Sequence, residues 1–122
     1  WQAVVADAEV DVVVAGIVPR HHGAIVRACI EAGKPVYIEK PVTETLEAGL
    51  ELAALNPGGA VPVAVGFNRR FAPATRVLRR AFATATGPVS VYYRISDDAR
   101  VRPPSQNWKL ADRLLIEVVH IF

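Results

Sequence analysis

Short apolar runs alternate with longer segments of helical period over the first 66 residues. The runs are of strand length and rich in valine, a pattern typical of parallel strands that are covered on both faces. Strands that alternate with helices in this way fit right-handed crossovers between neighbouring parallel strands. The predicted elements are a helix end at 2–7, strands at 11–16, 36–38 and 61–66, and helices at 22–32 and 44–55.

The helix predicted at 44–55 has both a cap and an apolar stripe in its sequence. Thr43 precedes it, and threonine is a preferred N-cap residue. Leu46, Leu50 and Ala54 follow one another at four-residue spacing, so we expect them to form the buried face.

The pattern changes after residue 66. A polar and aromatic connector leads to Pro73, which opens a basic helix to about residue 85. Residues 89–95 alternate apolar and polar side chains, which is typical of an antiparallel or half-exposed strand. A last segment, at about 111–122, is apolar almost all round. The sequence therefore predicts a boundary near 66–71, with one domain at 1–66 and the beginning of a second at 67–122.

Composition places the chain among globular proteins and limits the classes of partner that we expect for it. It has 122 residues, of which 52% are hydrophobic and 21% charged, and its longest apolar runs fall short of the roughly 20 residues that a membrane span needs. Cys29 has no partner for a disulfide within the chain, so we expect a reducing, cytoplasmic setting. The net charge is only +2. A solvated helix surface explains the clustered arginines, and we expect no nucleic-acid or membrane partner. The clustered arginines are Arg69, Arg70, Arg76, Arg79 and Arg80.

The carboxyl ends of the three predicted strands carry the candidate chemistry. Parallel strands end at the same edge of a sheet, so residues 16–19, 39–41 and 66–69 are expected to border one crevice. In doubly wound sheets this crevice binds nucleotides. The alternative is that these residues are ordinary polar loop entries.

Lys40 is the first candidate for chemistry at this edge. It follows an apolar strand, and a partly desolvated lysine is suited to proton exchange with a ligand. The alternative is that Glu39 simply neutralises it. The bond between Lys40 and Pro41 is a candidate for the cis form, which is found mainly before proline.

His120 is the second candidate. Arg113, Glu117 and His120 form one polar stripe on the predicted last helix, and Glu117 is placed to orient the imidazole. The alternative is a buried, hydrogen-bonded pair of Glu117 and His120. His22, at a helix start, is a weaker candidate that would contact a ligand through its ring or its backbone. No cluster has metal-ligand spacing, so no metal is expected.

Taken together, four segments resemble the Gfo/Idh/MocA oxidoreductases, and the resemblance covers nearly all 122 residues. Each segment is moderately specific, and their order and spacing make the resemblance strong. They are Asp11-Val12-Val13-Val14-Ala15 leading to Pro19-Arg20-His21-His22, Glu31-Ala32-Gly33-Lys34-Pro35-Val36-Tyr37-Ile38-Glu39-Lys40-Pro41, Val65-Gly66-Phe67-Asn68-Arg69-Arg70-Phe71 and Arg113-Leu114-Leu115-Ile116-Glu117-Val118-Val119-His120.

The resemblance implies an NAD(P)-dependent dehydrogenase of a sugar, cyclitol or related secondary alcohol. Its fold would be α/β, the C-terminal half of a Rossmann-like doubly wound parallel sheet followed by the start of an α+β substrate and oligomerisation domain. Lys40 would lie beside the nicotinamide and the substrate, and His120, assisted by Glu117, would be the acid/base. The implied cofactor contacts are Ile17, Pro19, His22, Glu39, Lys40, Pro41, Asn68 and Arg69.

The sequence departs from the family in two places. No G-x-G-x-x-G motif occurs, so the chain is expected to be a fragment that lacks the pyrophosphate-binding helix start and is inactive alone. The choice between NAD and NADP stays open for the same reason. The family's glycine-rich stretch is also absent near Leu110, where residues are expected to be missing.

Two other interpretations remain beside the enzyme. The chain is alternatively a non-catalytic ligand-binding or assembly domain derived from the family. The other is a truncated chain that is stable as a homo-oligomer, paired with another copy through the second-domain sheet, where Tyr92 and Arg94 share a face.

Overall fold

The computed structural model describes residues 1–88, 90, 92 and 94. The chain forms two compact units, Trp1–Phe67 and Asn68–Phe122. His120 and Glu117, the predicted acid/base pair, lie outside the described residues, as do the predicted segment at 111–122 and Leu110.

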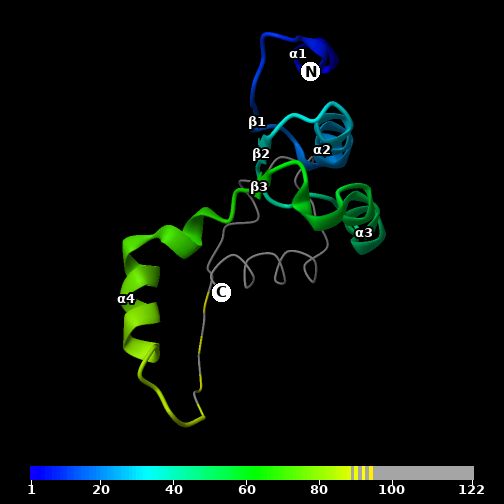
Figure 1. Cartoon of the computed structure of the whole chain (residues 1–122). Coiled ribbons are helices and arrows are strands. Elements are labelled where there is room, and N and C mark those ends of the chain that lie inside the picture. The colour runs from blue at the N-terminus through cyan, green and yellow to red at the C-terminus, as the bar shows by residue number, and fades with distance from the viewer. Residues whose placement is uncertain (89, 91, 93, 95–122) are drawn as a thin grey trace, which may run out of the picture. The chain divides into compact units, whose positions relative to one another are not determined.

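A three-stranded parallel sheet lies at the centre of the first unit (Figure 1). The strand order is β1-β2-β3, so β2 pairs on both sides. This arrangement confirms the predicted α/β fold with parallel strands. The elements of this unit are α1 (Gln2–Ala6), β1 (Val13–Ala15), the 3-10 turn η1 (Pro19–His21), α2 (His22–Glu31), β2 (Val36–Ile38), α3 (Leu46–Leu55), the 3-10 turn η2 (Pro57–Gly59) and β3 (Val63–Val65).

Helices α2 and α3 cover the same face of the sheet (Figure 1). Both crossovers step across the sheet in one direction, and right-handed connections then place both helices on one side. Val13 and Val36 face these helices and are buried, whereas Val14 is 74% exposed. The predicted burial on both faces is therefore wrong for the side of the sheet that carries Val14.

The core lies between the sheet and α2. Helix α2 contributes Ile25, Val26, Cys29 and Ile30, which recur at the spacing of one helix face. Cys29 is a free cysteine, and burial raises the pKa of its thiol, with a smaller opposing effect of Lys34. An uncharged thiol at neutral pH packs as a small apolar group, so Cys29 belongs to the core.

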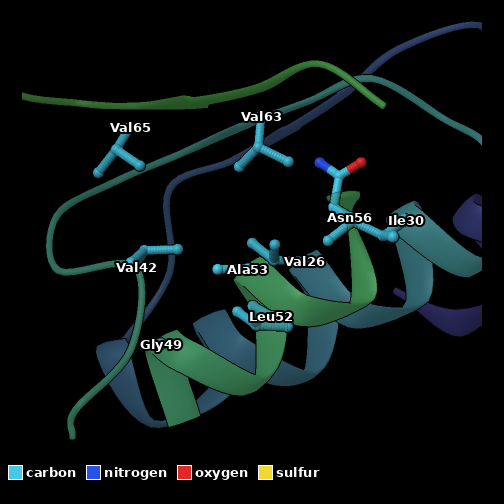
Figure 2. Close-up of a pocket in the computed structure, with 9 residues that line it drawn as sticks. All are labelled: Val26, Ile30, Val42, Gly49, Leu52, Ala53, Asn56, Val63 and Val65. Atoms are coloured by element: carbon cyan, nitrogen blue, oxygen red, sulfur yellow. The ribbon is translucent and has the colours of Figure 1, made fainter. Parts of the chain in front are cut away.

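A hollow of about 230 Å³ lies between α2, α3 and β3 (Figure 2). Among the residues that line it, Asn56 has the one polar side chain, and its amide is already paired with the backbone of Val61 in both directions. The distances are 2.8 Å from Nδ2 to the Val61 carbonyl oxygen and 2.9 Å from the Val61 amide nitrogen to Oδ1. The hollow is therefore an apolar groove that is partly open to solvent, and its lining residues are Val26, Ile30, Val42, Gly49, Leu52, Ala53, Asn56, Val63 and Val65.

Filling this hollow should stabilise the protein. Val63→Ile adds one methylene on the strand that faces the hollow, and burying it is expected to raise the free energy of unfolding by about 0.5–1 kcal/mol. Urea denaturation measures the change. Val14→Ile adds the same group on the exposed face and serves as the control. Equal effects of the two substitutions would show that the hollow does not accept the added group.

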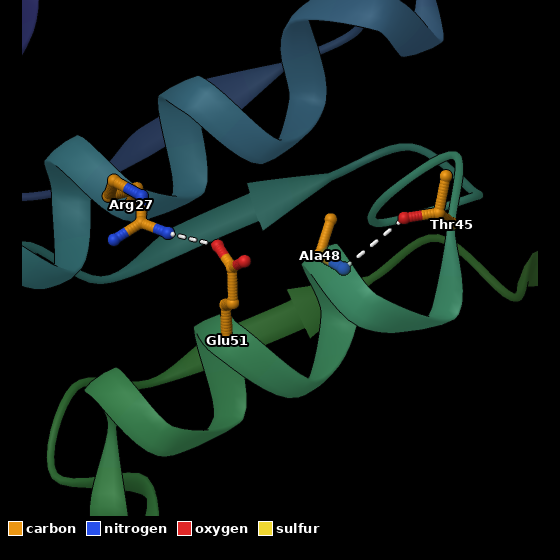
Figure 3. A network of polar contacts seen from close by, with 4 residues as sticks. All are labelled: Arg27, Thr45, Ala48 and Glu51. Carbon is orange, nitrogen blue, oxygen red and sulfur yellow. Dashed lines mark hydrogen bonds and ion pairs between the residues drawn. The ribbon is translucent and has the colours of Figure 1, made fainter.

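Helix α3 begins two residues later than its sequence suggests. Thr45, not Thr43, is the N-cap: its hydroxyl accepts a hydrogen bond from the Ala48 amide at 3.2 Å (Figure 3). The Thr43 hydroxyl instead donates to the Thr45 carbonyl at 2.9 Å. The predicted cap is therefore wrong by two residues, because either threonine has the required side chain and only the path of the loop selects between them.

The buried side of α3 also differs from the predicted stripe. Leu46 and Leu50 are 72% and 61% exposed, whereas Leu52 is buried. An ion pair joins α3 to α2, with 3.0 Å between Arg27 Nη2 and Glu51 Oε2 (Figure 3). Both side chains are largely exposed, so the pair contributes at most about 1 kcal/mol.

Of the second unit, the structure describes residues 68–88, 90, 92 and 94. The unit begins with the 3-10 turn η3 (Asn68–Phe71) and continues with α4 (Pro73–Phe82), which ends earlier than predicted. The Nε of Arg76 donates to the Phe71 carbonyl oxygen at 2.9 Å and ties the helix to the turn. The strand predicted at 89–95 lies largely outside the described residues. None of the helices that the structure describes is long and apolar enough to cross a membrane.

Candidate functional site

Backbone hydrogen bonds hold the carboxyl ends of the three strands side by side. The Glu39 amide donates to the Ala15 carbonyl oxygen at 3.2 Å, and the Gly66 amide donates to the Ile38 carbonyl oxygen at 2.8 Å. The ladder therefore continues one residue beyond β2 and β3. Residues that follow the strands consequently share one edge of the sheet, as the sequence predicts.

Strand β2 delivers Glu39 and Lys40 to this edge. Both residues are half-buried, and each has further polar contacts. Glu39 Oε2 accepts a hydrogen bond from the Lys40 amide at 3.3 Å, so the carboxylate turns back toward its own backbone. The bond between Lys40 and Pro41 is cis, which confirms the sequence prediction.

Gly66 brings β3 into close contact with the side chains of β2. A Cβ atom at this position would lie 2.7 Å from the Tyr37 hydroxyl oxygen, 3.0 Å from Glu39 Oε1 and 3.1 Å from Glu39 Cδ. Real Cβ atoms essentially never approach other atoms within 3.0 Å, so only glycine fits here without a shift. Tyr37 and Glu39 therefore cover the end of β3.

The sequence predictions missed Tyr37 as a site residue. Its signal was present, because Tyr37 and Glu39 are two residues apart and side chains at that spacing lie on the same face of a strand. What the pattern could not supply is the neighbour on β3, since the alignment of Gly66 beside them depends on the register of the sheet.

His22 is fully buried at the start of α2, and both of its ring nitrogens face backbone carbonyl oxygens. Nδ1 lies 2.6 Å from the carbonyl oxygen of Pro41, and Nε2 lies 2.9 Å from that of Ile17. The ring thus bridges the loops that follow β1 and β2. With no exposed surface, the imidazole does not offer a ligand the direct ring contact that was one of the two predicted modes.

The remaining predicted contacts lie on two separate parts of the chain. Ile17 is 41% exposed in the loop after β1, and Pro19 begins η1. Asn68 and Arg69 begin η3 in the second unit, where both have interactions. In the part of the chain that the structure describes, no group of three His, Cys, Asp or Glu side chains is arranged to hold a metal ion.

Comparison with known proteins identifies this arrangement. A sequence model described as "Oxidoreductase family, NAD-binding Rossmann fold" matches residues 1–67. Inositol 2-dehydrogenase 2 of Saccharopolyspora erythraea is 44% identical over 75 residues, which are 61% of this chain and 22% of that protein. Inositol 2-dehydrogenase of Paracoccus denitrificans is 38% identical over 92 residues, or 74% of this chain and 27% of that protein. The chain thus spans about a quarter of the length of the curated relatives that it matches.

Solved structures agree with the sequence comparison. A putative oxidoreductase from Magnetospirillum magnetotacticum superposes with a TM-score of 0.63 at 35% identity, over 72% of this chain and 28% of that one. Biliverdin reductase from Synechocystis, in complex with biliverdin and NADP+, gives a TM-score of 0.62 at 29% identity, over 68% of this chain and 26% of that one. The matched region contains the whole parallel sheet and the edge at which Lys40 lies. The chain belongs to the Gfo/Idh/MocA family of oxidoreductases, whose NAD-binding domain has the Rossmann fold.

Proposed function

We propose that this chain forms the nicotinamide side of the active site in an NAD(P)-dependent oxidoreductase that acts on a secondary alcohol. The observation that carries the proposal is the delivery of Glu39, Lys40 and Pro41 to the edge where the three strands end. Open α/β sheets bind their ligands at this edge. The family to which the chain belongs supports the same choice of cofactor.

The residues at this edge fit the nicotinamide end of a dinucleotide. Ile17 and Val18 expose apolar surface there, at 41% and 45%, and such surface suits one face of an aromatic ring. Gly66 leaves the end of β3 without a side chain, and any side chain there would meet Tyr37 and Glu39. The glycine-rich helix start that binds pyrophosphate does not occur in the sequence, so these residues account for one end of the cofactor.

The proposed reaction divides between the cofactor and two side chains of this chain. A bound nicotinamide would supply the acceptor for the hydride that leaves the alcohol carbon. Lys40 donates a hydrogen bond to the substrate oxygen and stabilises the charge that develops on it. His120, oriented by Glu117, takes the hydroxyl proton. The role of Lys40 is supported by its position at the strand edge. The role of His120 is supported by the family resemblance alone.

We propose a cyclitol or a sugar as the substrate class. The support is that two of the relatives are named inositol 2-dehydrogenases. The second unit would be the beginning of the substrate domain, and Tyr92, which is 88% exposed, would contribute to an interface between copies of the protein. A reducing, cytoplasmic location is proposed from the buried, free thiol of Cys29.

The assignment of Lys40 is tested by turnover of the protein that carries this chain. Reduced nicotinamide is followed by absorbance with inositols and sugars, using NAD+ and NADP+ in turn. Lys40→Met is expected to lower kcat by about 10²-fold or more, because proton-transfer and charge-stabilising groups contribute at that level, while cofactor affinity changes less.

Lys34→Met is the matched control. Lys34 precedes the opposite end of β2, where its ammonium donates to the Asp7 carbonyl oxygen, so its loss should leave kcat unchanged. Absence of turnover with every pair of alcohol and nicotinamide would favour the non-catalytic alternative. Full activity of Lys40→Met would remove Lys40 from the chemistry.

A further inference from the structure

We infer that His22 is a positioning residue that fixes the two loops beside Lys40 to each other and to helix α2. The ring accepts no ligand in this role. It holds the carbonyl groups of Ile17 and Pro41 at 2.9 Å and 2.6 Å, one from each loop. In this role His22 sets the shape of the loops and takes no part in the proposed chemistry.

The full burial of the imidazole makes its polar contacts important to the folded structure. His22 is 0% exposed, and a buried polar ring is costly unless its nitrogens are hydrogen-bonded. A leucine or phenylalanine would occupy a similar volume without that cost. Both nitrogens are instead within hydrogen-bond distance of an oxygen, so the site is built around the ring's polarity.

The two acceptors come from segments that the sheet does not tie together. Ile17 lies between β1 and η1, and Pro41 lies three residues beyond the end of β2. The last backbone bond between these strands in this direction is that of the Glu39 amide to the Ala15 carbonyl. Beyond it, the His22 side chain contacts the backbone of both loops, and it is carried by the first residue of α2.

The two contacts can be removed one at a time, because the amide side chains imitate the two ring nitrogens separately. Asparagine places its NH₂ group near the position of Nδ1, the atom that faces Pro41. Glutamine reaches the position of Nε2, the atom that faces Ile17. Leucine fills the space and has no polar atom to face either carbonyl oxygen.

The experiment measures backbone ¹⁵N relaxation of this chain with His22 and with the three replacements, and without any nicotinamide. In His22→Leu, order parameters at residues 16–18 and 40–43 are expected to fall from about 0.85, typical of rigid backbone, toward 0.6. Helix α2 at Cys29 and Ile30 should keep its values. His22→Asn should restore residues 40–43 alone, and His22→Gln residues 16–18 alone.

Two results would overturn the inference. Equal loosening of α2 and both loops in all three variants would show that His22 only fills space in the core. Unchanged order parameters in the loops would show that other contacts fix them. If His22→Leu does not fold, the opposite patterns expected for His22→Asn and His22→Gln still decide the matter. Because no cofactor is present, the outcome is independent of whether the chain transfers hydride.

Discussion

Replacing Gly66 with alanine is expected to lower the free energy of unfolding by about 1–3 kcal/mol, as overpacked sites do. The added Cβ would lie 2.7 Å from the Tyr37 hydroxyl and 3.0 Å from Glu39 Oε1. Both contacts are with side-chain ends at β2, and both side chains are half-buried and have other interactions, so making room for the Cβ requires them to give up existing contacts. Urea denaturation of the purified chain measures the change.

Gly16 provides the matched control for this substitution. It follows β1 at the same edge of the sheet, its φ is not positive, and a Cβ there meets nothing within 4 Å. Gly16→Ala is therefore expected to be neutral or to stabilise by up to about 1 kcal/mol, through the lower entropy of the unfolded chain.

A second substitution identifies the cause of the effect. Tyr37→Phe removes the nearest of the atoms that crowd Gly66, so the double variant with Gly66→Ala should recover part of the lost stability. Similar effects of alanine at Gly16 and Gly66, or strictly additive effects of the Tyr37 and Gly66 substitutions, would contradict the close contact described above.

Truncation of Ile38 is expected to have the largest effect on stability. Ile38 is 0% exposed, lies on the central strand and pairs with Ala15 and Val65. Ile38→Ala should lower the free energy of unfolding by about 2–5 kcal/mol, the range for truncating a buried isoleucine and leaving a cavity in the core. Marginal stability of 5–15 kcal/mol is typical of whole domains, so the variant should retain only part of its folded population on mild heating.

Val14→Ala tests whether this cost comes from burial. Val14 lies on β1 but is 74% exposed, so its truncation should cost less than about 1 kcal/mol. Thermal and urea denaturation, followed by circular dichroism, compare the two variants. If Val14→Ala destabilised the chain as much as Ile38→Ala, the exposed face of the sheet would have to be covered in solution.

The sheet was predictable from sequence because its signals are local. Each strand is a compact apolar run between polar segments, and the helix between two such runs implies parallel pairing. Burial on both faces was not predictable in the same way. Val14 and Val13 have identical side chains, and which of them faces the helices depends on the direction in which the crossovers step.

The buried side of α3 shows a second limit. Its sequence, LEAGLELAAL, has apolar residues on more than one side, so several stripes satisfy the helical period. The stripe through Leu46 and Leu50 is the more regular, yet Leu52 is the residue that packs against the core. Only contact with the neighbouring helix and sheet decides between such stripes.

The candidate site was predictable in its position and not in its construction. The ends of parallel strands are defined by the sequence, and Lys40 and Glu39 were located from them. The contacts of His22 reach 5 residues back and 19 residues on, and no periodic pattern encodes them. The contact of Gly66 with Tyr37 likewise depends on the sheet register.

The most direct test of the strand edge as a nicotinamide site is an NMR titration of this chain with NAD+ and with NADP+. Weak binding is expected, with amide shifts confined to residues 16–22, 39–43 and 66–67 and reduced in Lys40→Met. Binding that shifted the residues around the hollow, such as Ala53 and Asn56, would contradict the assignment, as would unchanged spectra at millimolar concentrations of both nucleotides.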